Sequence, residues 1–149
     1  MAYNLLRLAG YTAETRYEEA ALGIYRVLGT ALSEYPMAFG EMLIGVDFYL
    51  RRPQEIAIVG DLADERTEVL LSVIRDHYRP LAVVALAPKN PDPNTVPALL
   101  RSRTLRDSAP AVYVCETFVC AAPVTTPEAL SALLNKKFAA PIDRVEEET

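Results

Sequence analysis

Residues 54–60 (QEIAIVG) are the stretch that most constrains how this chain can fold. The run is β-branched at alternate positions, and no charge follows Glu55, which is typical of a strand buried on both faces. Gly60 and Asp61 interrupt it, and an amphipathic stretch begins at Asp64. We therefore predict a strand that leads through a short loop into a helix, with helices before it and alternating strands and helices after it.

The segment before this strand has the periodicity of helices. Apolar residues recur at helical spacing in three runs, which cover residues 5–9, 12–33 and 36–50. Gly10 is expected to end the first helix, and Thr12 is expected to cap the second. Because the links are short, the pattern predicts an antiparallel helical hairpin. The third helix is apolar on most sides and requires neighbours on more than one of them.

The segment after the strand contains two more apolar runs. Residues 81–86 and 111–115 are predicted to be buried strands. Asp64 is expected to cap a helix that stops at Pro80, and a last helix is expected to start at Thr126, which is followed by proline and glutamate.

This order of elements predicts an α/β fold. We expect an N-terminal helical hairpin region (1–53) followed by a small α/β domain (54–149), in one compact unit. Strand–helix–strand connections of this length predict parallel pairing through right-handed crossovers. The prediction is a small, mostly parallel sheet with helices on both faces, a Rossmann-like three-layer arrangement with the strand order second–first–third.

Length and charge narrow the class of protein. A chain of 149 residues can bury a proper core, and a net charge of −5 argues against a nucleic-acid surface. No apolar run approaches the roughly 18 residues of a membrane span, and no signal peptide is visible, so we predict a cytoplasmic protein without a membrane partner. The chain opens directly in helical pattern, which indicates a piece of a longer protein. Its acidic end, 146–149, is predicted to be a solvated tail.

The carboxyl ends of the predicted strands are where an α/β sheet would hold a ligand. Asp61, Lys89 and Glu116 follow or end the three strands and are the candidate residues of this rim. A phosphate-binding loop would need several glycines, whereas Gly60 stands alone beside a carboxylate. We therefore predict no ATP or NAD binding and no cofactor.

Cys115 and Cys120 are the two cysteines of the chain. On one continuous strand their sulfur atoms would point to opposite faces, and the residues between them carry no turn signal. We therefore predict that both are reduced and at least partly buried. No metal site is expected, since structural zinc needs four ligands and His77, placed at a solvated helix end, is the single histidine.

Residues 111–128 (AVYVCETFVCAAPVTTPE) follow a pattern like Y-V-C-x-N-F-x-C-Q-x-P-x-T-x-P-E-x-L. This segment resembles the closing stretch of the thioredoxin domain-containing, spermatogenesis-associated family of bacteria and animals. Segments 4–9, 35–43 and 55–61 are similar to that family as well. Thr117 stands where the family usually has asparagine, and Ala121 where it has glutamine.

The resemblance implies a role within a longer protein. Members of the family have a thioredoxin-like domain followed by an (α/α) barrel, a six-hairpin arrangement like that of sugar epimerases and glycosidases. This chain would be the C-terminal end, consisting of the last barrel helices and an α/β appendage. It contains no C-x-x-C, so the thioredoxin site is absent, and the carboxylates of the barrel would lie mostly upstream.

These observations favour a non-catalytic structural or interaction module. Without the barrel, the helix at 36–50 is expected to expose Met37, Met42, Phe48 or Tyr49, and a homodimer through the helical half would cover them. One alternative is an enzyme domain that binds a sugar-like or nucleotide-like molecule at the strand ends. Another is a thiol-redox protein, which would need the sulfur atoms of Cys115 and Cys120 in contact.

Overall fold

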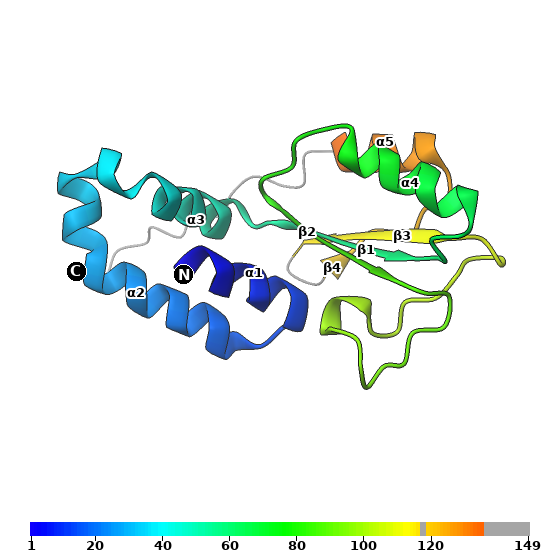
Figure 1. Cartoon of the computed structure of the whole chain (residues 1–149), viewed down its shortest axis with the longest axis horizontal. Coiled ribbons are helices and arrows are strands. Elements are labelled where there is room, and N and C mark those ends of the chain that lie inside the picture. The colour runs from blue at the N-terminus through cyan, green and yellow to red at the C-terminus, as the bar shows by residue number, and fades with distance from the viewer. Residues whose placement is uncertain (117–118, 136–149) are drawn as a thin grey trace.

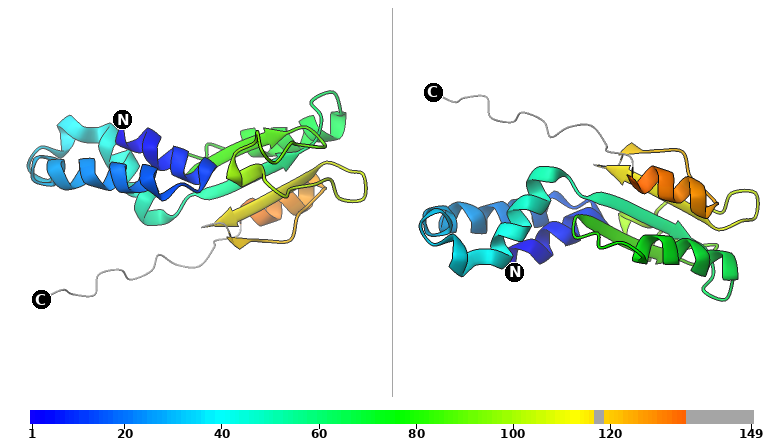
Figure 2. Two further views of the ribbon diagram at one scale, coloured as in Figure 1. Left: turned by 90° about the horizontal axis from the view of Figure 1, so that it is seen from below. Right: turned by 90° about the horizontal axis from the view of Figure 1, so that it is seen from above.

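The computed structural model describes residues 1–116 and 119–135; the tail predicted at 146–149 lies outside them. The N-terminal elements are α1 (Ala2–Thr12), α2 (Thr15–Glu34), the 3-10 helix η1 (Pro36–Phe39) and α3 (Gly40–Arg51). The following elements are β1 (Gln54–Val59), α4 (Glu65–Arg75), β2 (Ala82–Ala87), the 3-10 helix η2 (Ala98–Leu100), β3 (Ala111–Glu116), β4 (Val119–Cys120) and α5 (Pro127–Asn135). The helical part and the sheet lie side by side along the long axis (Figures 1 and 2).

The first helix does not end at Gly10, which corrects the prediction. Helix α1 continues to Thr12 because Gly10 is the point at which it packs on the sheet: a Cβ atom there would lie 3.2 Å from the Val83 side chain. Thr12 also does not cap α2. Its hydroxyl donates to the Leu8 carbonyl (2.8 Å), and α2 begins at Thr15 without a side-chain cap.

Two tyrosines connect α1 to the sheet. The Tyr3 hydroxyl donates to the Pro80 carbonyl and the Tyr11 hydroxyl to the Val84 carbonyl, each at 3.2 Å. Both rings pack against the buried cluster that α1 shares with the strands. These contacts place the helical part directly against β2.

The four strands form one sheet in the order β2-β1-β3-β4. The predicted order of the first three strands is confirmed, but the prediction of a mostly parallel sheet is wrong. Strands β1 and β2 are parallel, whereas β3 is antiparallel to β1 and β4 is antiparallel to β3. Strand β3 begins at Ala111 opposite Val59, so the connection at 88–110 stays at one end of the sheet and contains η2 in place of a crossover helix.

The two faces of the sheet carry different layers. Ile56 and Ile58 face α4 and α5, where they pack with Leu70 and Leu130. The alternate residues of β1 face a second cluster formed with α1 and η2 (Figure 1). The fold is therefore mixed α/β, and the Rossmann-like arrangement is not confirmed.

One of the four side chains of the third helix that were expected to be exposed is buried. Phe48, predicted as a candidate for exposure, is buried and packs edge-on against Tyr3, with ring centroids 5.3 Å apart. Met37 is 96% exposed, and Met42 and Tyr49 are half-buried. Within the described residues, no helix combines the length and apolar character that a membrane span requires.

Candidate functional site

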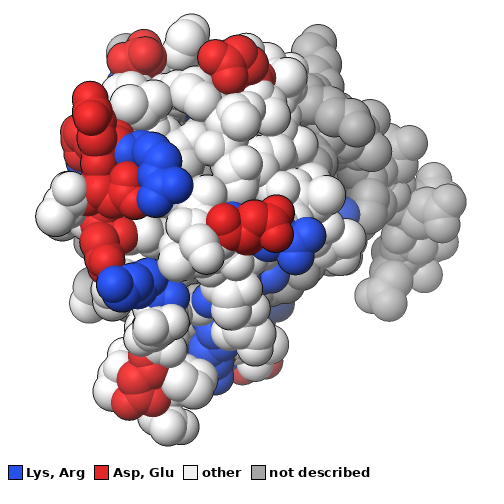
Figure 3. Space-filling model, turned by 90° about the vertical axis from the view of Figure 1, so that its right-hand side faces the viewer, with Lys and Arg blue, Asp and Glu red and all other residues white. Residues whose placement is uncertain are grey.

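Two of the three predicted rim residues meet at the end of β1 and β2. The Lys89 ammonium lies 3.6 Å from a carboxylate oxygen of Asp61, and the Lys89 N–H donates to the other oxygen at 3.4 Å. Both side chains are largely exposed, so water screens this ion pair. Figure 3 views the molecule from this end and shows acidic and basic groups interspersed, without a continuous basic surface.

Glu116, the third predicted rim residue, lies at the opposite end of the strands. Because β3 is antiparallel, Glu116 is paired with Gln54, the first residue of β1. The three rim residues therefore do not converge. Burial raises the pKa of Glu116, and the positive charge of Arg52 partly opposes this rise.

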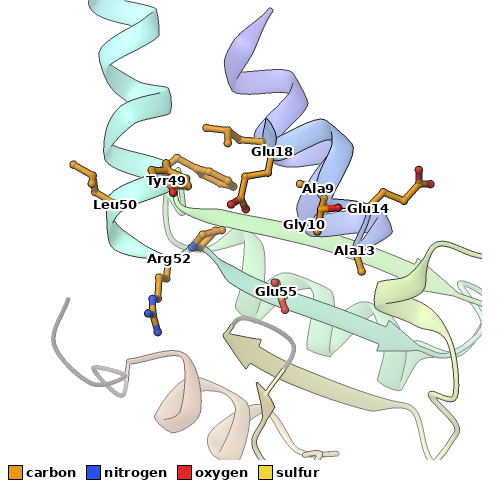
Figure 4. A pocket seen from close by; sticks show the side chains of 13 residues that line it. Ala9, Gly10, Ala13, Glu14, Glu18, Tyr49, Leu50, Arg52 and Glu55 are labelled. Atoms are coloured by element: carbon orange, nitrogen blue, oxygen red, sulfur yellow. The ribbon is translucent and has the colours of Figure 1, made fainter. Parts of the chain in front are cut away.

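A cavity of about 450 Å³ lies near this end of the sheet, between the end of α1, the start of α2, the end of α3 and the start of β1 (Figure 4). Leu6 and Phe48 belong to its apolar wall, and Arg52 and Glu55 line it from the start of the sheet. Sequence reasoning missed this cavity, because its walls come from four separate elements. The available signal was Glu55, a charge in an otherwise apolar strand.

The charged groups of the cavity are carboxylates and one guanidinium. Glu55 is 4% exposed and occupies the α1 face of β1. Figure 4 shows the Glu18 side chain pointing toward the space above β1, whereas Glu14 points away and forms an ion pair with Arg16. Carboxylates and a guanidinium beside apolar and aromatic groups can bind a ligand that carries hydroxyl or amino groups.

The prediction that Cys115 and Cys120 are reduced is wrong: the structure contains a disulfide between them. The two residues are not on one strand. Strand β4 is antiparallel to β3, which places Cys120 directly opposite Cys115 with a Cα–Cα distance of 3.9 Å. The prediction of partial burial is confirmed, since Cys115 is fully buried and Cys120 half-buried.

Arg103 stands beside this disulfide. Its guanidinium Nη2 donates to the sulfur of Cys120 at 3.0 Å and lies 3.7 Å from the sulfur of Cys115. The same guanidinium stacks on the Tyr113 ring, 5.0 Å from its centroid. Arg103 belongs to the RSRTLR segment at 101–106, whose local concentration of arginine was the available sequence signal.

The remaining candidate groups among the described residues, His77 and possible metal ligands, do not form a site. His77 is exposed, as predicted, but α4 ends at Arg75 and does not continue to Pro80, so His77 lies beyond the helix. In the part of the chain that the structure describes, no three residues of the types His, Cys, Asp and Glu are grouped closely enough to hold a metal ion.

Comparison with known proteins identifies partial relatives. Spermatogenesis-associated protein 20 of Rattus norvegicus is 29% identical over 138 residues, and the protein of the same name from Mus musculus is 28% identical over 138 residues. Each match covers 91% of this chain but 17% of the relative. An uncharacterized protein of Caenorhabditis elegans is 27% identical over 134 residues, which cover 89% of this chain and 18% of that protein. No protein-family model and no solved structure matches.

The resemblance stated from the motifs is thus confirmed in part. The chain is similar to a segment of spermatogenesis-associated protein 20 and spans only 17% of the length of its mammalian relatives. The comparisons do not test the thioredoxin-like domain or the (α/α) barrel, which stay predictions.

Proposed function

We propose that this chain is a non-catalytic structural or interaction module, the C-terminal part of a larger thioredoxin domain-containing protein. The observation that carries the proposal is the coverage of the match, 91% of this chain against 17% of its relatives. A segment with this coverage fits one part of a longer protein. In such a protein, the helices α1 to α3 would pack against the preceding helices of the barrel.

The exposed apolar side chains of α2, η1 and α3 support a docking role. They are Val27 on α2, Tyr35 and Met37 around η1, and Leu43, Ile44 and Leu50 on α3. A neighbouring protein surface that covered these side chains would remove apolar area from water and would stabilise the complex. On the isolated chain, a second copy is the simplest cover, and a twofold homodimer is the commonest symmetry.

The experiment is a measurement of mass in solution. Light scattering of the isolated chain is expected to give a dimer at high micromolar concentration. The double substitution Met37→Glu, Ile44→Glu should give a monomer with an unchanged circular dichroism spectrum. Leu62→Glu is the matched control, since Leu62 is also exposed but follows β1, far from η1 in the chain.

Two outcomes would contradict this proposal. The first is a monomeric mass for the unmodified chain at every concentration. The second is a dimer that persists in the double variant, because association would then use another surface.

A second candidate function is binding of a sugar-like molecule, and the cavity between α1, α3 and β1 favours it. Its carboxylates and Arg52 could bind hydroxyl groups, while Leu6 and Phe48 could contact an apolar ring face. We expect a hexose to raise the unfolding temperature of the chain and of Glu14→Gln, and to raise it less for Glu18→Gln. Glu14 is the matched control: it also lines the cavity, but its carboxylate points away from the space above β1 and pairs with Arg16. The absence of a shift with any hexose tested would exclude this candidate.

A further inference from the structure

We propose that Cys115 and Cys120 form a thiol–disulfide exchange site that accepts electrons from a dithiol, with Arg103 favouring the thiolate form. This inference does not depend on the proposed module function. It rests on the disulfide, on the unequal burial of its two sulfur-bearing residues, and on the cation that contacts both sulfur atoms.

The two cysteines differ in accessibility. Cys115 is fully buried in β3, between β1 and β4. Cys120 is half-buried in β4, a two-residue strand at the edge of the sheet, beside Val119, which is 76% exposed. Cys120 is therefore the more accessible of the two residues, and we expect an incoming thiolate to attack its sulfur before that of Cys115.

This difference sets the order of the exchange. The thiolate of a dithiol attacks the sulfur of Cys120, a new sulfur–sulfur bond forms, and Cys115 leaves as a thiolate. The second thiol of the reductant then loses its proton. The resulting thiolate attacks the reductant's other sulfur atom, which is bonded to Cys120 in the mixed disulfide, and Cys120 leaves as a thiolate. The dithiol is oxidised by two electrons to a cyclic disulfide, the protein disulfide is reduced, and the two protons lost by the reductant end on the cysteines or in solvent.

Arg103 is placed to assist both steps. A cation beside a sulfur atom favours the thiolate, which is both the better leaving group and the nucleophile of the reverse reaction. The guanidinium contacts both sulfur atoms and is held by the Tyr113 ring and by the Leu99 carbonyl, to which Nε donates at 3.5 Å. Arg103 is thus a fixed positive charge next to both sulfur atoms, and it would stabilise whichever of them leaves as a thiolate.

The fold keeps the cysteines near one another without the covalent bond. The Ala121 N–H donates to the Val114 carbonyl at 3.0 Å. Val112 and Val124 exchange two backbone hydrogen bonds, at 2.8 and 3.0 Å. The segment after β4 therefore stays alongside β3 by backbone pairing, so the reduced dithiol can close again.

The first test measures exchange in the folded chain. We expect dithiothreitol to reduce the bond without denaturant, and oxidised dithiothreitol to restore it, as counted by alkylation and mass spectrometry. In the reduced protein, Arg103→Gln should slow alkylation near neutral pH by about tenfold and move the pH profile of alkylation to higher pH. Arg103→Lys keeps a cation and should retain most of the rate. Arg101→Gln, an exposed neighbour in the same loop, is the matched control and should behave as the unmodified chain.

The second test separates the two sulfur atoms. Cys115→Ser should alkylate rapidly at Cys120 and form a lasting mixed disulfide with a small aromatic disulfide. Cys120→Ser should react far more slowly, because Cys115 is buried. Circular dichroism of each variant checks that it is folded.

Three results would overturn the proposal. The first is a bond that is reduced only after unfolding. The second is equal pH profiles for Arg103→Gln and Arg101→Gln, which would leave Arg103 a structural role alone. The third is equal alkylation rates for the two folded cysteine variants.

Discussion

The Tyr25 hydroxyl on α2 occupies the space that a side chain at Gly45 on α3 would need. The hydroxyl donates to the Met42 carbonyl at 3.3 Å, and burial raises the pKa of Tyr25. A Cβ atom at Gly45 would also lie 3.2 Å from the Tyr3 Cβ of α1. All three N-terminal helices therefore meet at this glycine.

Gly45→Ala is expected to destabilise the protein by about 1–3 kcal/mol, because the added methyl group displaces the Tyr25 side chain from its place on α3. Gly29→Ala is the control: Gly29 lies inside α2 with no atom within 4 Å of an added Cβ, so alanine should stabilise the helix by about 0.5–1 kcal/mol. Urea unfolding of both variants measures the difference. Equal effects of the two substitutions would show that α2 and α3 are not packed this closely.

Tyr113→Phe is expected to cost about 1 kcal/mol of unfolding free energy. The Tyr113 hydroxyl donates to the Thr104 carbonyl at 2.8 Å and accepts from the Thr104 N–H at 3.3 Å, and phenylalanine makes neither bond. The aromatic ring under Arg103 remains, so the alkylation rate of Cys120 should not change. Tyr113→Leu also removes the ring that holds the Arg103 guanidinium, so the alkylation rate of Cys120 should change.

Asp64→Ala should lower stability more than Asp61→Ala, although the two residues share one loop. The Asp64 carboxylate caps α4 by accepting from the Arg66 N–H at 3.0 Å, and the Arg66 side chain lowers the pKa of Asp64. A lowered pKa means that this stabilisation is present above the unfolded-state pKa and is lost as the pH falls through the folded-state value. Thermal unfolding of both variants between about pH 3 and pH 7 tests this. If the stability difference between the two variants were as large at the acid end of this range as at the neutral end, the assignment of this effect to the Asp64 carboxylate would be wrong.

Glu116→Gln is expected to become more stabilising, relative to the unmodified chain, as the pH rises. Burial raises the pKa of Glu116, so the folded state binds its proton more tightly than the unfolded state does. The contribution of Glu116 to stability is therefore fully present below the unfolded-state pKa and is lost as the pH rises through the folded-state value. Denaturant unfolding from about pH 4 to pH 7 measures the difference, and a constant difference would refute the assignment.

The sequence alone determined the places of β1, β2, β3, α4 and α5, but not that of β4. The alternation in β1 predicted a strand, Asp64 predicted the start of α4, and Thr126 and Pro127 predicted the start of α5, whose Ala129 N–H donates to the Thr126 hydroxyl. These signals succeed because capping and side-chain periodicity depend on residues within a few positions of one another.

Only the tertiary structure decided the direction of β3 and the contacts that depend on that direction. The connection at 88–110 stays at one end of the sheet because its Leu99 and Leu100 are buried against β1 and α1, a contact between residues far apart in the chain. That path made β3 antiparallel, which moved Glu116 away from Asp61 and Lys89. The antiparallel pairing of β3 and β4 places Cys120 opposite Cys115. A local pattern specifies that a segment is extended, but the packing of its connections decides which way it runs and which side chains meet.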